Sequence, residues 1–197
     1  MKLSRVVRDT MKVLEAGLRV AGAATRTPAR TLAEASSGSH GTVAAHVASS
    51  DEQEASCDER ALFLSVKPHY ANAILDGKKT VELRRTRPSL PDGSLVILYS
   101  STPTRAVVGW AQLAGVRQGT PGEIWHEFGA AAAIAEPEYD VYFDGSAQAF
   151  ALELGDVVAA SQPVPLSAIR SMGIQPPQSW RYVPTAVSTE ILKSAAL

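Results

Sequence analysis

Cysteine is almost absent from this sequence, since Cys57 is the only one among 197 residues. A single cysteine excludes an internal disulfide and any metal site that is built from several cysteines. The four histidines, His40, His46, His69 and His126, are scattered along the chain without the spacing of metal ligands. We therefore expect a protein without a bound metal and without a cofactor.

Long hydrophobic runs are also missing. No stretch approaches the roughly 18–20 apolar residues that a membrane-spanning helix needs, and the first residues lack the charged segment, apolar core and cleavage site of a secretion signal. We therefore expect a cytoplasmic protein that does not contact a membrane. Apolar residues still form 45% of the chain and charged residues 20%, which is sufficient for a hydrophobic core of ordinary size.

The net charge of -1 hides an uneven distribution of charge along the chain. Basic residues dominate positions 61–120, whereas positions 121–160 contain no Lys or Arg and collect acidic residues. Two interpretations stay open: a molecule with one cationic and one acidic face, or two ordinary solvated surfaces. The basic residues of the first segment are Lys67, Lys78, Lys79, Arg84, Arg85, Arg87, Arg105 and Arg117.

The composition divides the chain into three parts. Residues 1–60 form an N-terminal extension that we predict to be largely disordered, because most of it is rich in Ser, Ala and Gly. Apolar residues at helical spacing predict one helix there, over residues 3–20. A partner-binding helix, an upstream start codon and an organelle transit peptide remain alternatives for this extension. Residues 61–184 form the domain, and residues 185–197 a C-terminal tail.

The domain begins with a predicted strand, helix and strand. Residues 62–66 are apolar except for one serine and precede Pro68, which suits the first turn of a helix. Gly77 ends that helix. Residues 79–85 then form the second predicted strand, and a proline-rich turn follows it.

Two more strands and a helix follow. Residues 95–99 are apolar throughout, which indicates a central strand covered on both faces. Residues 106–116 contain two glycines and predict a strand with bulges or bends. Thr120 and Glu123 then form a capping box, which predicts that a helix begins there.

The remaining segments complete an α+β domain. A second short helix is predicted after Pro137 and ends at Gly145, and residues 150–154 and 157–164 read as two strands joined by a turn. Five or six short strands with Gly and Pro at their corners, and two or three flanking helices, fit a small closed or nearly closed β-barrel better than an open sheet.

A short motif connects this chain to a known family. The eight residues from Gly77 to Arg84 read Gly-Lys-Lys-Thr-Val-Glu-Leu-Arg, which resembles the Gly-x-Lys-x-x-Glu-x-Arg signature of the ASCH domain. The match holds at Gly77, Lys79, Glu82 and Arg84. The surrounding segments agree over residues 61–184, and residues 176–182 resemble the closing segment of a bacterial branch often labelled as predicted transcriptional regulators.

The resemblance implies a PUA-like β-barrel, with a cleft at the junction of the first helix and the second strand. The superfamily includes proteins that bind RNA or modified bases, so the expected partner is RNA or a nucleoside or nucleotide. One ASCH branch deacylates N4-acetylcytidine with a lysine and a glutamate, and other members have been credited with ribonuclease activity. The deacylating branch carries threonine where this chain has Glu82, which weakens the transfer of that activity.

The residue types of the motif also suit a ligand. Lys79 and Arg84 can donate to phosphate or base acceptors, and Glu82 can accept from an exocyclic amine or orient Lys79. The hydroxyl groups of a predicted strand end and residues from segments shared with the family complete the expected binding set. That set is Lys67, Lys79, Glu82, Arg84, Ser100, Ser101, Thr102, Ser179 and Arg181.

Four functions remain open at this point. The first is binding of RNA or a modified nucleotide, and the second is hydrolysis of an N4-acylated cytidine-like nucleoside, with Lys79 as nucleophile or base and Glu82 as proton carrier. The third is a transcription-associated regulator, and the fourth a solvated cluster of ion pairs without a ligand. In a regular strand Lys79 and Glu82 point to opposite sides, so their contact requires that the glycine turn displaces Lys79.

Overall fold

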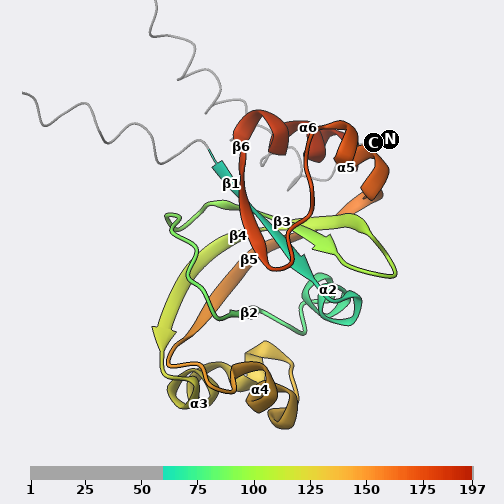
Figure 1. Cartoon of the computed structure of the whole chain (residues 1–197). Coiled ribbons are helices and arrows are strands. Elements are labelled where there is room, and N and C mark those ends of the chain that lie inside the picture. Colours follow the sequence, from blue (N-terminus) through green and yellow to red (C-terminus); the bar gives the residue numbers. More distant parts are fainter. Residues whose placement is uncertain (1–59, 197) are drawn as a thin grey trace, which may run out of the picture. The chain divides into compact units, whose positions relative to one another are not determined.

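The computed structural model of this protein describes residues 60–196 (Figure 1). The predictions made for the extension, its helix over residues 3–20 and Cys57 lie outside the described residues. The described part has six strands and five helices, which confirms the predicted α+β class. In chain order they are β1 (Arg60–Val66), α2 (Pro68–Leu75), β2 (Val81–Arg84), β3 (Leu95–Ser100), β4 (Ala106–Gly119), α3 (Pro121–Ala132), α4 (Glu136–Phe143), β5 (Ala149–Pro165), α5 (Leu166–Ser171), β6 (Trp180–Pro184) and α6 (Thr185–Ala196).

The six strands form one sheet in the order β2-β5-β4-β3-β1-β6. Strands β1 and β3 run parallel, and every other pair is antiparallel. Strands β4 and β5 are long, with 14 and 17 residues, and their ladder shifts register at three places. Such irregularities bend a sheet and increase its twist. Among the described residues no ladder joins β2 to β6, so hydrogen bonds do not close the sheet into a complete barrel.

The structure corrects two of the expected element boundaries. The second strand begins at Val81 and not at residue 79, and the two strands expected over 150–164 are one continuous strand, β5. Two helices, α5 and α6, were not predicted. Helix α6 occupies the expected tail and packs on β5, with Ile191, Leu192 and Ala195 buried.

Two hydrophobic clusters support the sheet. The larger one joins β1, β3, β4 and β5 to helix α2, and Leu62, Leu98 and Leu152 are completely buried in it. The smaller one joins β2 and the start of β5 to α3 and α4, through residues such as Phe128 and Tyr139. In Figure 1, α3 and α4 lie together at one end of the sheet, below β2. Strand β2 therefore packs with the α3–α4 pair.

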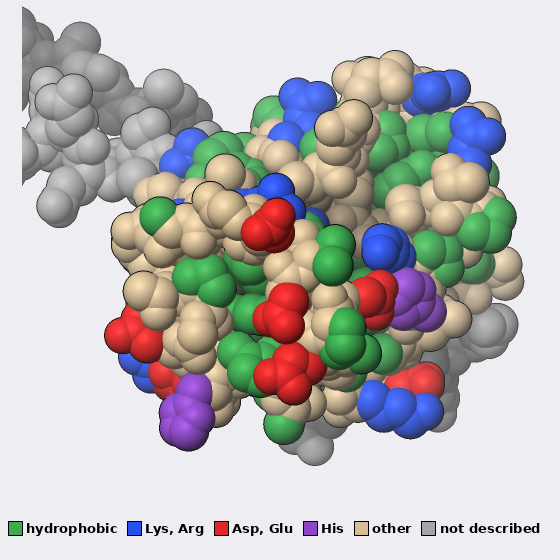
Figure 2. All heavy atoms as spheres, turned by 60° about the horizontal axis from the view of Figure 1, so that its bottom comes forward, with side chains coloured by type: hydrophobic (Ala, Val, Ile, Leu, Met, Phe, Trp, Pro, Cys, Tyr) green, Lys and Arg blue, Asp and Glu red, His purple; other side chains and the backbone are tan. Residues whose placement is uncertain are grey.

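Acidic side chains gather on the α3–α4 end of the domain. Figure 2, in which the bottom of Figure 1 comes forward, shows Asp and Glu side chains clustered on that face. Glu127, Glu136, Glu138, Asp140 and Asp144, from α3, α4 and the residue after α4, are all exposed. Within residues 60–196, no helix is long and apolar enough to cross a membrane. The cytoplasmic location stays a prediction.

Candidate functional site

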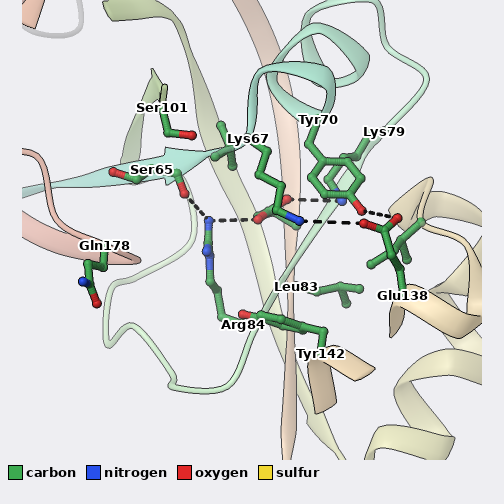
Figure 3. A pocket seen from close by; sticks show the side chains of 13 residues that line it. Ser65, Lys67, Tyr70, Lys79, Leu83, Arg84, Ser101, Glu138, Tyr142 and Gln178 are labelled. Atoms are coloured by element: carbon green, nitrogen blue, oxygen red, sulfur yellow. Dashed lines mark hydrogen bonds and ion pairs between the residues drawn. The ribbon is translucent and has the colours of Figure 1, made fainter. Parts of the chain in front are cut away.

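A cavity of about 250 Å³ opens where α2, β2 and α4 meet (Figure 3). Its walls come from segments that are far apart in the sequence: the end of β1, the start of α2, strand β2, helix α4 and the segment before β6. The lining residues are Ser65, Val66, Lys67, Tyr70, Lys79, Glu82, Leu83, Arg84, Ser101, Ile134, Glu138, Tyr142 and Gln178.

The turn after α2 places Lys79 at this cavity. Gly77 adopts a left-handed conformation with φ of 73°, which glycine tolerates better than other residues. The backbone N–H groups of Lys78 and Lys79 then both donate to the carbonyl of Ala73 at 2.9 Å. Lys79 is thereby held outside the strand, and the alternation of β2 begins only two residues later. This explains how Lys79 and Glu82 meet although a regular strand would separate them.

Lys79, Glu82 and Arg84 form a buried ion-pair network. Glu82 bridges the two cations, with its Oε2 3.2 Å from Lys79 Nζ and its Oε1 2.8 Å from Arg84 Nη2. The three side chains are only 3%, 8% and 9% exposed. Because both carboxylate oxygens are engaged, Glu82 neutralises one of the two positive charges and leaves one in excess.

Two further contacts fix the lysine. Lys79 Nζ donates to the backbone carbonyl of Ala132 at 2.5 Å and lies 4.9 Å from the centre of the Tyr70 ring. Burial lowers the pKa of the Lys79 ammonium below its usual range, and the neighbouring Glu82 carboxylate partly opposes that shift. A lysine with a lowered pKa supplies a free amine more readily than a surface lysine does.

Arg84 is tied to β1 as well as to Glu82. Its Nη2 donates to the backbone carbonyl of Ser65 at 2.8 Å, and Ser65 Oγ in turn donates to the carbonyl of Pro177 at 2.7 Å. Within residues 60–196, the buried Nε of Arg84 has no hydrogen-bond partner. Both contacts of the guanidinium thus use Nη2. Its Nε–H remains a hydrogen-bond donor without an acceptor among the described residues.

The rim of the cavity carries a second, more exposed group of polar side chains. Glu138 of α4 lies 3.7 Å from Lys67 Nζ through Oε1, and its Oε2 accepts from the Tyr70 hydroxyl at 3.3 Å. Burial, together with the Glu138 carboxylate, raises the pKa of Tyr70 to about 12, so that its hydroxyl stays protonated at neutral pH. Figure 3 shows these side chains reaching from opposite walls toward one another.

The structure brings together five of the nine predicted binding residues: Lys67, Lys79, Glu82, Arg84 and Ser101 all line the cavity. The four others do not line it. Ser100 is buried at the end of β3, Thr102 is exposed beyond that strand, Ser179 contributes its backbone carbonyl to Ser65 N–H, and Arg181 is exposed and contacts the Gln175 carbonyl.

Several residues that line the cavity were not among the predicted site residues. Glu138 and Tyr142 lie on α4, which is more than 50 positions after the motif, and only the packing of α4 beside β2 brings them to the cavity. Tyr70 lies on α2, and its hydroxyl reaches Glu138 at the rim. Among the described residues no group of three or more His, Cys, Asp or Glu side chains is arranged to hold a metal ion.

Comparison with known proteins agrees with the fold and the motif. The family model of the ASCH domain matches residues 64–158. An ASCH domain-containing ribonuclease of Zymomonas mobilis is 34% identical over 128 residues, which cover 64% of this chain and 86% of that protein. The large ribosomal subunit protein uL22 of Ureaplasma parvum is 31% identical over 106 residues, or 53% of this chain and 33% of that protein.

Solved structures extend the comparison. The crystal structure of ASCH from Zymomonas mobilis has a TM-score of 0.64 and 32% identity, and the alignment covers 68% of this chain and 94% of that one. A serine-to-alanine variant of the same protein gives a TM-score of 0.66 with 29% identity over 70% of this chain and 97% of that one. Because a relative at 34% identity is covered over 86% of its length, this chain belongs to the ASCH domain family.

Proposed function

We propose that the cavity binds one nucleotide unit of single-stranded RNA, with Arg84 as its principal anchor. The observation that carries this proposal is the state of the Arg84 guanidinium. It is buried at the cavity wall, it belongs to a network that carries one positive charge in excess, and within residues 60–196 its Nε has no partner. A buried arginine with unused donors is suited to a phosphate or base oxygen, because its planar fork matches such acceptors.

The size of the cavity supports a single unit. Pockets for drug-sized ligands have volumes of roughly 300–1,000 Å³, and this one, at about 250 Å³, lies below that range. Two aromatic side chains, Tyr70 and Tyr142, line it together with Leu83. Aromatic rings of this kind stack on nucleobases with little dependence on the base. The lining thus offers an apolar surface for a base and cations for its phosphate.

The family relationship favours RNA over other ligands. The Zymomonas mobilis relative is an ASCH domain-containing ribonuclease, and the alignment covers most of that protein. A ribonuclease must hold an RNA strand. An RNA ligand for this chain therefore agrees with both the relative and the lining of the cavity.

Cleavage of RNA is the second candidate function. Similarity to the ASCH domain-containing ribonuclease of Zymomonas mobilis favours it. The lowered pKa of Lys79 would suit a base or a nucleophile. Hydrolysis of an N4-acylated cytidine is less favoured, because the proposed proton carrier Glu82 already bridges Lys79 and Arg84 with both oxygens. Release of cytidine from N4-acetylcytidine, or of fragments from RNA, distinguishes the two reactions from binding alone.

The test is RNA binding by a double variant, Lys79→Ala with Arg84→Ala. We expect its affinity for a 2′-O-methylated single-stranded oligonucleotide, which resists cleavage, to fall at least tenfold, or about 1.4 kcal/mol. The salt dependence of binding should become shallower, because fewer cations contact phosphate. Fluorescence anisotropy at several salt concentrations measures both quantities.

The matched control removes the same charge from nearby exposed positions, Lys78→Ala with Arg87→Ala. Circular dichroism must show that each variant is folded, and Arg84→Lys provides a milder change that keeps the charge and removes the fork. If the double variant and the control bind RNA as tightly as the original protein, the cavity is not the RNA site.

A further inference from the structure

The charges around the cavity limit the kind of anion that it accepts. Five ionisable side chains of Lys, Arg and Glu line it: three cations, Lys67, Lys79 and Arg84, and two carboxylates, Glu82 and Glu138. Glu82 pairs with Lys79 and Arg84, and Glu138 pairs with Lys67. With every group in its charged form, the lining carries one positive charge in excess.

The excess charge has a definite position. It lies in the buried network, because Lys67 and Glu138 at the rim compensate each other at 3.7 Å. Within that network, Arg84 is the cation with unused donor capacity among the described residues. Lys79 is by contrast engaged by Glu82 and by the Ala132 carbonyl. One anionic group placed at Arg84 would therefore neutralise the lining.

A second negative charge on the ligand would find no unpaired cation among the described residues that line the cavity. The rim instead presents Glu138, whose side chain is 53% exposed and whose carboxylate faces Tyr70 and Lys67. A terminal phosphate carries about -1.5 to -2 charge at pH 7, whereas an internal phosphodiester carries one. The extra charge would be repelled by Glu138 or would have to displace it from Lys67.

We infer that the cavity selects an internal phosphodiester unit over terminal phosphomonoesters and polyphosphates, and that Glu138 sets this preference from the rim. This inference rests on the proposed function, because it names the part of an RNA strand that the same cavity holds. The protein would thus recognise positions within a strand and discriminate against the phosphorylated ends of a strand and against nucleoside triphosphates.

The experiment compares three ligands on the full chain at low ionic strength: a 2′-O-methyl dinucleotide with one phosphodiester and free hydroxyl ends, the same dinucleotide with a 5′-phosphate, and a nucleoside triphosphate. We expect the two more highly charged ligands to bind about three- to tenfold more weakly than the first. In Glu138→Gln, the ratio of the affinity for the first ligand to the affinity for each more highly charged ligand should move toward one. Isothermal titration calorimetry measures all three affinities.

The matched control is Glu136→Gln, which removes an equal charge from an exposed position of the same helix that does not line the cavity. It should leave the ratio unchanged. Equal or tighter binding of the 5′-phosphorylated dinucleotide by the original protein overturns the inference and leaves the proposed function intact, as does an unchanged ratio in Glu138→Gln. If none of the three ligands binds, the inference and the proposed function both fail.

Discussion

The wall and the rim of the cavity use the same types of charged side chain in different surroundings. At the wall, Lys79, Glu82 and Arg84 are at most 9% exposed and joined at 2.8–3.2 Å. At the rim, Lys67 and Glu138 are 65% and 53% exposed and 3.7 Å apart. Water screens the rim pair, whereas the wall network has been taken out of water and depends on its internal partners.

This difference assigns different roles to the two groups. A buried charge that loses its partner is costly, so the wall is expected to be rigid and its geometry to be fixed before a ligand arrives. An exposed ion pair contributes little to stability and can open and close at little cost. We therefore expect the wall to hold the ligand and the rim to discriminate between ligands.

Replacement of Glu82 is expected to give the largest effect. Glu82→Gln removes the bridge between two buried cations, and we expect the free energy of unfolding to fall by about 3–5 kcal/mol. Urea denaturation followed by tryptophan fluorescence measures this loss.

Glu138→Gln is the matched control for the same measurement, because it removes a carboxylate from the rim of the same cavity. The free energy of unfolding of Glu138→Gln should fall by no more than about 1 kcal/mol. Equal losses in the two variants would show that the wall and the rim do not differ in the way described.

A smaller effect should appear in the pH dependence of stability. Burial raises the pKa of Tyr70 to about 12, with a further contribution from Glu138, whereas an unfolded tyrosine titrates near pH 10. Between these values the folded state binds more protons than the unfolded state, so the contribution of Tyr70 is present below pH 10 and is lost as the pH rises to about 12. The stability difference between the original protein and Tyr70→Phe should therefore decrease over this range.

Tyr139 provides the comparison for this prediction. Its pKa is also raised to about 12, by burial and by Asp140, and it packs between α3 and α4 away from the rim. In Glu138→Gln, the loss of stability at alkaline pH that is due to Tyr70 should become smaller. The loss that is due to Tyr139 should stay unchanged. An equal change at both tyrosines would contradict a specific contact between Glu138 and Tyr70.

The sequence predicted the elements that depend on local chemistry. The start of α3 is confirmed, because Thr120 and Glu123 form the reciprocal capping box that their spacing indicated. The start of α2 at Pro68 and the turn at Gly77 are confirmed for the same reason. The two strands expected over residues 150–164 are in fact one, because β5 keeps its pairing with β4 on both sides of a register shift, where Asp156 takes the left-handed conformation.

The candidate site was predictable only in part. The motif indicated Lys79, Glu82 and Arg84 because they match the signature of the ASCH domain and are residue types that suit a ligand. Strand alternation argued against a contact between Lys79 and Glu82, and the placement of Lys79 before β2 removes that objection. Glu138 and Tyr142 could not be predicted, because tertiary packing alone brings α4 to the cavity. The buried residues of α6, Ser188, Ile191, Leu192 and Ala195, follow helical spacing, but only two of them are large and apolar, so the signal in the sequence is weak.

The most direct test of the central claim is to locate the ligand on the protein. Isotope-labelled full chain is titrated with the 2′-O-methyl dinucleotide, and NMR chemical shifts of the backbone and of the arginine Nε–H groups are followed. We predict that Arg84 Nε–H, Tyr70 and Ser101 shift with one common affinity, while Ile191 and Leu192 of α6 do not. Shifts centred on α6, or on the exposed segment around Thr102, with Arg84 unaffected, would contradict the assignment of the cavity as the RNA site.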